Sequence, residues 1–181
     1  MGTASRLVSA LLRAFRPSSP ARRSAPAPRP RETAGRVDAV RPGQAAGETA
    51  TVEVAPPRRL TLTYAPARDG APNGGEIIWT WVPYEERDGR GKDRPVLVIG
   101  RADATRSYAV RLTSKPHASD RDYLALGAGE WDPQGRPSWV DIEQVYLVHD
   151  AGMRREAAAL DRRRFDAVAS ALSARYGWRV G

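Results

Sequence analysis

Apolar side chains alternate with polar ones over much of the chain after residue 73, at the period of two that is typical of strands. The segment from Ile77 to Val82 is rich in β-branched and aromatic residues, which fit the pleated surface of a sheet. Further along, Tyr108, Val110 and Leu112 occupy one face of another alternating segment. The pattern predicts strands at residues 77–82, 96–99, 106–113, 123–126, 139–142 and 145–148, separated by turns rich in Gly, Pro and Asp.

The hydrophobic period changes near the C-terminus. Asp161 is a residue type that caps helix N-termini, and Gly177 is one that ends helices. Between them, one helical face carries Phe165, Val168, Ala169, Leu172 and Tyr176. Short strands followed by a single helix predict a mainly β fold of the α+β class, a small and strongly bent antiparallel sheet or barrel with a C-terminal helix.

The first 72 residues have a different character. They hold 10 of the 15 prolines and none of the five tryptophans. Residues 17–57 are of low complexity, rich in Pro, Ala and Arg, with too little apolar surface to offset the entropy of ordering. We therefore predict a disordered tail over residues 1–72 and a folded domain over residues 73–181. Within the tail, residues 60–64 alternate like a strand and are expected to add an edge to that domain.

A short apolar stretch at residues 5–16 leaves two interpretations open. Its leucines and Phe15 recur at helical spacing beside arginines, as in an amphipathic helix that binds a partner or a membrane surface. The favoured alternative is a nascent helix without function, or a misassigned start codon. The stretch is short and no small-residue cleavage site follows it, which argues against a signal peptide.

Charge is divided in the same way as order. Residues 1–72 hold 12 arginines against 5 acidic residues, a net charge of +7, whereas residues 73–181 hold 15 arginines and 2 lysines against 16 acidic residues, a net charge of +1. The high isoelectric point therefore belongs to the tail and does not indicate a basic face on the domain. Lys92 and Lys115 are the only lysines among 29 basic residues, so arginine is common throughout the chain. A single arginine is therefore informative only through its position.

Several classes of chemistry are excluded by what the sequence lacks. There is no cysteine, which rules out disulfides and thiolate metal sites and fits a reducing cytoplasm. Walker loops, dinucleotide-binding glycine motifs and the serine hydrolase elbow are absent. No apolar run approaches the roughly 18 residues that a membrane helix needs. With two histidines, and with the acidic residues of loop 84–93 read as a charged surface loop, we expect neither a metal nor a cofactor.

Four segments after residue 73 are informative in their order. Residues 75–101 read GEIIWTWVPYEERDGRGKDRPVLVIGR, residues 108–117 read YAVRLTSKPH, residues 139–148 read WVDIEQVYLV, and the predicted helix follows. In this order they resemble the PemK/MazF family of toxins from type II toxin–antitoxin systems, over about residues 75–178. The resemblance implies an SH3-like antiparallel barrel of the PemK/MazF and CcdB type, with a C-terminal helix.

The resemblance also implies an activity. Members of this family are metal-independent, sequence-specific endoribonucleases that cleave single-stranded RNA such as mRNA. The ribose 2′-OH attacks its own phosphodiester, which leaves a 2′,3′-cyclic phosphate and a 5′-hydroxyl. By the same resemblance, we expect a cytoplasmic homodimer that is regulated by a cognate antitoxin peptide and does not span a membrane.

Individual residues acquire roles through the resemblance. Arg94, directly before Pro95, matches the family's catalytic arginine, and a guanidinium fork suits two oxygens of a phosphorane at once. Pro95 biases Arg94 towards extended backbone, which would fix its position at the strand entrance. Thr113 matches the family's catalytic Thr or Ser, with Ser114 as the neighbouring candidate. The candidate substrate-binding residues are Glu85, Arg87, Lys92, Lys115 and His117.

Two other functions compete with this one. A non-catalytic SH3-like module that binds nucleic acid or protein would keep the fold without the activity. A toxin directed at DNA gyrase, as in the related CcdB branch, is the third hypothesis. In that branch we would not expect the Arg-Pro-Val-Leu-Val segment together with the Thr-Ser pair, which favours the ribonuclease.

Overall fold

The computed structural model describes residues 50–67, 69–84 and 90–181, except for the side chains of residues 155–157. The described residues belong to one unit, Asp38–Gly181, and the helix considered for residues 5–16 lies outside them. In chain order the elements are β1 (Val52–Val54), β2 (Thr61–Leu62), β3 (Glu76–Pro83), β4 (Gly91–Arg101), β5 (Arg106–Thr113), β6 (Tyr123–Gly127), β7 (Ser138–His149), the 3-10 turn η1 (Asp150–Gly152), β8 (Met153–Ala159), α1 (Arg162–Tyr176) and β9 (Arg179–Val180).

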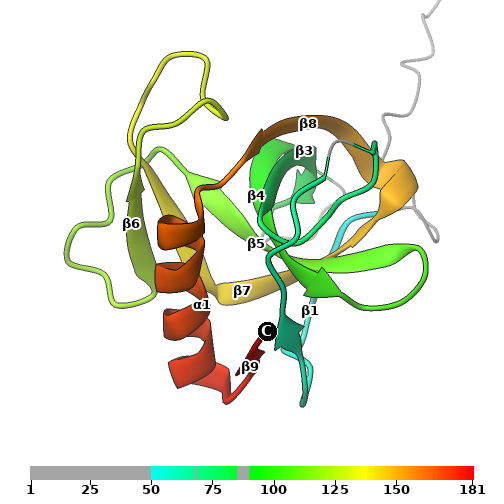
Figure 1. Ribbon diagram of the computed structural model, residues 1–181. Helices are drawn as coiled ribbons and strands as arrows, with labels where there is room; N and C mark the ends of the chain where they lie inside the picture. Colours follow the sequence, from blue (N-terminus) through cyan, green and yellow to red (C-terminus); the bar gives the residue numbers. More distant parts are fainter. Residues whose placement is uncertain (1–49, 68, 85–89) are drawn as a thin grey trace, which may run out of the picture. The chain divides into compact units, whose positions relative to one another are not determined.

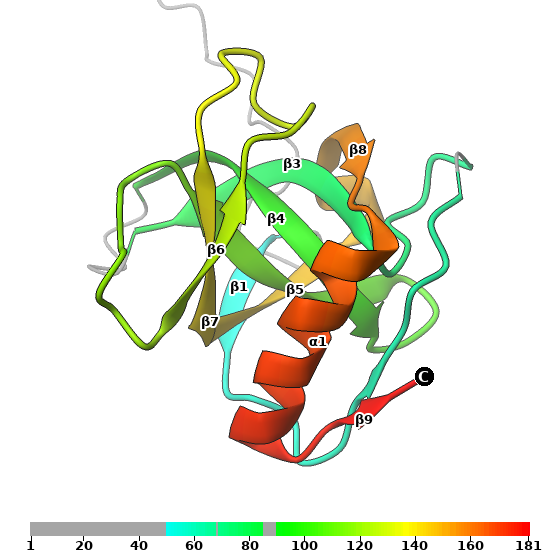
Figure 2. The same cartoon turned by 60° about the vertical axis from the view of Figure 1, so that its left-hand side comes forward.

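Seven strands form one antiparallel sheet in the order β1-β7-β5-β4-β3-β8, with β6 also paired to β7. The sheet is strongly bent, and α1 lies across one of its faces (Figures 1 and 2). The bend brings the start of β1 to β3, where the hydroxyl oxygens of Thr51 and Thr80 are 2.7 Å apart in a buried hydrogen bond. The predicted fold class, a small bent antiparallel sheet followed by a helix, is confirmed.

Alternate strand positions fill two hydrophobic cores on the two faces of the sheet, as the period of two requires. The larger core lies under α1 and includes Ile77, Leu97 and Val110 from three adjacent strands. The smaller core takes neighbouring strand positions, among them Ile78 and Val96. Both faces of the central strands β3, β4 and β5 are therefore covered, which holds the strand ends in fixed relative positions.

Helix α1 follows the predicted pattern closely. The Asp161 carboxylate accepts a hydrogen bond from Arg164 N at 3.0 Å, and Gly177 ends the helix in the left-handed conformation with φ of 70°. Such a conformation favours glycine because a side chain would be strained there. The predicted face is confirmed for Phe165, Val168, Ala169 and Leu172, which are buried.

Strand β8 is not predicted by the hydrophobic pattern. Its sequence, MRREAAA, consists mostly of residues with high helix propensity. It is nevertheless extended, with Ala159 opposite Glu76 and Met153 opposite Thr80 of β3. The backbone hydrogen bonds to β3 satisfy its polar groups, and this long-range pairing outweighs the local preference for helix.

The packed structure begins before the domain boundary that composition predicts at residue 72. β1 pairs with β7, and β2 pairs with β9 in a separate parallel pair. Leu60 and Leu62 are buried, and Trp178 Nε1 donates to Pro57 O at 2.8 Å. The structure therefore differs from the expected division at residues 50–67. A few apolar side chains suffice to dock this segment, although the prolines and arginines around them dominate its composition.

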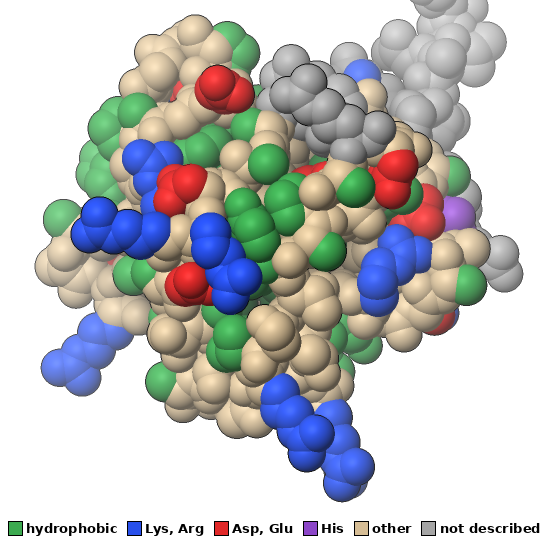
Figure 3. Space-filling model, in the orientation of Figure 1, with side chains coloured by type: hydrophobic (Ala, Val, Ile, Leu, Met, Phe, Trp, Pro, Cys, Tyr) green, Lys and Arg blue, Asp and Glu red, His purple; other side chains and the backbone are tan. Residues whose placement is uncertain are grey.

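The surface carries charges of both signs. Figure 3 shows acidic side chains interspersed among the basic ones on the face towards the viewer. In the part of the chain that is described, no helix combines the length and the apolar character needed to cross a membrane.

Candidate functional site

A pocket of about 320 Å³ lies where β4 begins and β5 ends. One wall comes from these two strands and from β3, and the other comes from the segment between β6 and β7. The lining residues are Trp79, Lys92, Asp93, Arg94, Pro95, Leu112, Thr113, Ser114, Lys115, Trp131, Asp132, Arg136 and Ser138. We call this cavity the β4–β5 pocket.

Strand register brings Arg94 and Thr113 to this pocket from different parts of the sequence. Val96 of β4 lies opposite Arg111 of β5. Arg94 and Thr113 are each two residues beyond that pair, towards the same end of the two strands, and side chains two apart share a face of a sheet. On its other side Arg94 lies opposite Thr80 of β3. The half-buried Arg94 is therefore positioned by strands on both flanks.

The hydroxyl of Thr113 is held in a defined position at the end of β5. Its Oγ1 accepts a hydrogen bond from the backbone N–H of Lys115 at 3.1 Å. A hydroxyl that accepts in this way keeps its own proton for donation. The same turn places Ser114 and Lys115 along the pocket, where both side chains are exposed.

Positive charge exceeds negative charge around the pocket. Among the described lining residues, four are cationic and two are acidic. Each of these acids has an arginine beside it, since Asp93 lies 3.2 Å from Arg154 and Asp132 lies 2.7 Å from Arg136. The pKa of Lys92 is lowered, first by the charge of Arg94, then by partial removal from water, and further by Arg111 and Arg136. Such a surplus of cations favours an anionic ligand.

Arg111, which precedes the pocket-lining Leu112 on β5, belongs to a buried polar network. Arg111 Nη2 is 2.7 Å from Asp141 Oδ2, and it donates more weakly to the hydroxyl of Tyr123 at 3.4 Å. Tyr146 donates to Gln144 Oε1 at 2.8 Å. Burial raises the pKa of Tyr146 to about 12, against the opposing effect of Arg111, so this phenol stays protonated at neutral pH.

The structure brings five of the candidate residues from the sequence together in the pocket. Arg94, Thr113, Ser114, Lys92 and Lys115 all line the pocket. Glu85 and Arg87 lie outside the described residues.

His117, the remaining candidate substrate-binding residue, lies elsewhere. It is not among the pocket-lining residues. Instead its ring stacks on Tyr123 at the start of β6, with 3.6 Å between ring centroids, and its Nδ1 lies 3.6 Å from Asp120. The stacking contact directs the imidazole towards β6.

Sequence reasoning missed the second wall of the pocket. The segment between β6 and β7 brings Trp131, Asp132 and Arg136 into the lining, and Ser138 joins them from the start of β7. The sequence predicted only a turn for this segment, because Asp132 begins an Asp-Pro-Gln-Gly stretch between two predicted strands. Nothing in that pattern indicates which side chains the turn directs towards β4.

The donor set is that of an anion site. Over residues 50–67, 69–84 and 90–181, no group of three or more His, Cys, Asp or Glu side chains is arranged to hold a metal ion. Guanidinium, ammonium, hydroxyl and indole groups dominate the lining. These are groups that bind phosphate, support a negatively charged transition state or stack on a base.

Solved structures similar to this chain include several toxins. One is the MazE–MazF complex (Form-II) from Deinococcus radiodurans, with 18% identity, a TM-score of 0.47, and coverage of 59% of this chain and 96% of that chain. Another is an endoribonuclease in complex with its cognate antitoxin from a mycobacterial species, with 14% identity, a TM-score of 0.45, and coverage of 57% and 92%. A third is the Mycobacterium tuberculosis toxin MazF-mt6, with 15% identity, a TM-score of 0.42, and coverage of 57% and 97%.

The sequence itself matches a family model over most of the folded part. No curated protein was found to match the chain. The model for the PemK-like, MazF-like toxin of type II toxin–antitoxin systems matches residues 73–175. This range covers β3 to β8, all of α1 except its last residue, and all residues that line the β4–β5 pocket. The chain therefore belongs to the PemK-like, MazF-like family of toxins.

Proposed function

We propose that this protein is a metal-independent endoribonuclease toxin that cleaves single-stranded RNA in the β4–β5 pocket. The observation that carries the proposal is that Arg94 and Thr113, 19 positions apart in the printed sequence, line one cationic cavity. Membership of the toxin family supports the same function.

In the proposed reaction the 2′-oxygen of a ribose attacks the adjacent phosphorus, and the bond from phosphorus to the 5′-oxygen breaks. One proton leaves the 2′-hydroxyl and one reaches the departing 5′-oxygen, so the products are a 2′,3′-cyclic phosphate and a 5′-hydroxyl. The reaction passes through a phosphorane with additional negative charge on its equatorial oxygens. Groups that stabilise this charge more than that of the starting diester accelerate the step.

Arg94 and Thr113 are suited to that task. The guanidinium of Arg94 can donate to two phosphorane oxygens in parallel, and the hydroxyl of Thr113, fixed by the Lys115 N–H, can donate to the same anion. Ser114 is the neighbouring hydroxyl on the pocket rim. A preorganised donor of this kind typically contributes about 3–4 kcal/mol to transition-state stabilisation.

Substrate binding falls to the cations around these two residues. Lys92 lies on β4 with Arg94, and Lys115 follows the end of β5. Both line the pocket, and each can neutralise a phosphate of the RNA. We also propose that Glu85 and Arg87 contact RNA, and that a cytoplasmic homodimer is regulated by a cognate antitoxin.

Incubation of the purified full-length protein with a mixed ladder of single-stranded RNAs, with and without EDTA, tests the proposal. We expect cleavage in both conditions and products that end in a cyclic phosphate. A DNA ladder of the same sequences should stay intact, because it lacks the attacking 2′-hydroxyl. Cleavage that disappears with EDTA and returns with magnesium would overturn metal independence. Binding without cleavage would favour the non-catalytic module.

A further inference from the structure

The segment between β6 and β7, residues 128–137, forms the wall of the pocket opposite β4 and β5. Trp131 fixes it to the body of the protein, since its ring is buried and its Nε1 donates to Ser138 Oγ at 3.1 Å. Gly129 packs directly against this ring, because a Cβ at that position would lie 2.0 Å from Trp131. The wall is therefore tightly packed around Trp131.

This turn holds one arginine at the pocket. The Nε of Arg136 donates to Asp132 Oδ2 at 2.7 Å. The other oxygen of the same buried carboxylate accepts from Gln134 N at 2.9 Å, and Asp132 O accepts from Gly135 N at 2.8 Å. Because the carboxylate is fixed on both sides, it sets the position of the guanidinium that it binds.

Most of the hydrogen-bonding capacity of Arg136 is not used by this anchor. Its side chain is 54% exposed. Among the described residues, its only hydrogen-bond partner is Asp132, which takes the Nε. The two Nη groups carry four further N–H donors. An arginine that is anchored through Nε and keeps its Nη groups for solvent is prepared to bind an oxyanion.

Arg136 also adds to the potential inside the pocket. It acts on Lys92 from the opposite wall and contributes to the lowered pKa of that ammonium group. Two like charges that face each other across a cavity repel, and an anion bound between them relieves the repulsion. The cavity of about 320 Å³ is at the small end of the range for ligand sites, roughly 300–1,000 Å³.

We propose that Arg136 binds a backbone phosphate of the RNA strand next to the scissile one, so that the turn between β6 and β7 is the second half of the substrate site. The proposal rests on the proposed function for the identity of the polyanion. In it, Arg94 acts on the reacting phosphate, while Arg136 and Lys92 hold its neighbour. Asp132 is a positioning residue that acts through Arg136.

Binding of a fluorescent 2′-O-methyl RNA oligonucleotide, which lacks the attacking hydroxyl, tests this directly. Anisotropy titrations of the full-length protein at several salt concentrations give both the affinity and its dependence on salt. For Arg136→Gln we expect an affinity about tenfold lower, the scale of losing one charge-assisted hydrogen bond. The slope of log affinity against log salt should fall by roughly 0.7, the value for one phosphate contact on a single strand.

Two further variants make the test specific. Arg163→Gln removes an equal charge from an exposed position in the first turn of α1, outside the pocket, and should leave both affinity and slope unchanged. Asp132→Asn keeps Arg136 but weakens its anchor, so the affinity should fall while the slope stays near that of the unaltered protein. Thermal melts of all variants separate these effects from loss of folding.

Equal affinity and slope for Arg136→Gln and Arg163→Gln would overturn the proposal, and Arg136 would then serve only to neutralise Asp132. The binding measurement does not depend on cleavage. If the unaltered protein binds the oligonucleotide through Arg136 but cleaves no RNA, the proposed function fails and the phosphate site stands. If RNA is cleaved but Arg136→Gln binds the oligonucleotide normally, the proposed function stands and the phosphate site at Arg136 fails.

Discussion

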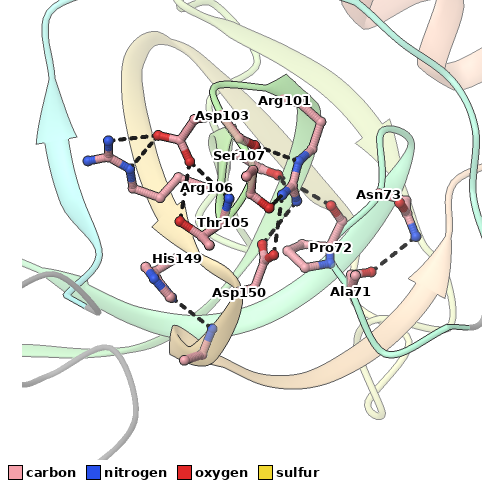
Figure 4. Close-up of polar contacts among 12 residues, drawn as sticks. Ala71, Pro72, Asn73, Arg101, Asp103, Thr105, Arg106, Ser107, His149 and Asp150 are labelled. Atoms are coloured by element: carbon pink, nitrogen blue, oxygen red, sulfur yellow. Dashed lines mark hydrogen bonds and ion pairs between the residues drawn. The ribbon is translucent and has the colours of Figure 1, made fainter.

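Strand β4 carries an arginine near each end, and the two are used differently. At its far end, Arg101 makes five hydrogen bonds within the protein, two of them to the carboxylate of Asp150 and one to Ser107 Oγ (Figure 4). The other two go to backbone carbonyls of the turn between β4 and β5. A guanidinium has five N–H donors, so Arg101 is saturated by the fold.

The near end of β4 has the opposite balance. Arg94 lies in a pocket where cations outnumber acids among the described lining residues, and the charge of Arg94 is the largest cause of the lowered pKa of Lys92. The fold thus gathers a surplus of positive charge around this end of β4. Residue type does not separate a structural arginine from a candidate catalytic one in this chain. The local balance of charge separates the two kinds of arginine.

The largest effect on RNA cleavage is expected when the guanidinium of Arg94 is replaced. Arg94→Lys keeps the charge and replaces a bidentate donor with a single ammonium group. RNA cleavage should fall by roughly 100-fold or more, the scale of losing one oxyanion donor, while affinity for a non-cleavable RNA hardly changes. Single-turnover cleavage and anisotropy measure the two quantities.

Arg101→Lys is the matched control, since it makes the same exchange on the same strand at the saturated end. It should cleave at the rate of the unaltered protein. If Arg94→Lys also does, Arg94 has no catalytic role and the non-catalytic module becomes the better-supported function.

Removal of the hydroxyl at the pocket should have the next largest effect. Thr113→Ala is expected to lower the cleavage rate on the order of 100-fold, because one donor to the phosphorane is lost. Thr113→Ser keeps the hydroxyl and should retain most of the activity. Circular dichroism and thermal melts should match those of the unaltered protein. A full rate for Thr113→Ala would transfer the role to Ser114.

A substitution of Arg101, at the saturated end of β4, should lower the stability of the protein and leave its activity unchanged. Arg101→Gln removes the contacts to Asp150 and leaves that carboxylate without its cation. The side chains of the pair are 38% and 30% exposed, so we expect a loss of about 1–2 kcal/mol in the free energy of unfolding. Urea denaturation measures it. A larger effect on cleavage than on stability would contradict the distinction between the two ends.

The smallest effect is expected in the pH dependence of stability. Hydrogen bonds from Arg106 and from the Thr105 N–H lower the pKa of Asp103, in the turn between β4 and β5, from 3.8 to about 2. A lowered pKa in the folded state means that the stabilisation is complete above pH 3.8 and is lost as the pH falls towards 2. Asp103→Asn should therefore flatten the decline of the urea midpoint in this window. An unchanged decline would show that other acids determine it.

Local pattern was sufficient for much of the molecule. Strands β3 to β7, α1 and its caps at Asp161 and Gly177 could be predicted, because periodicity and capping depend on residues a few positions apart. Arg94 and Thr113 were nominated as catalytic from short motifs, and the structure places both in one pocket. Their roles remain predictions that the variants above address.

Only the tertiary structure decided what depends on distant partners. Strand β8 is extended because β3 pairs with it, and His117 is drawn to Tyr123 by ring stacking. Leu62 docks in the core although its surroundings in the sequence are rich in proline and arginine. Arg136 reaches the pocket because a packed turn around Trp131 carries it there. Sequence specifies which groups are present, but contacts between residues tens of positions apart determine which charges remain uncompensated and where an anion can bind.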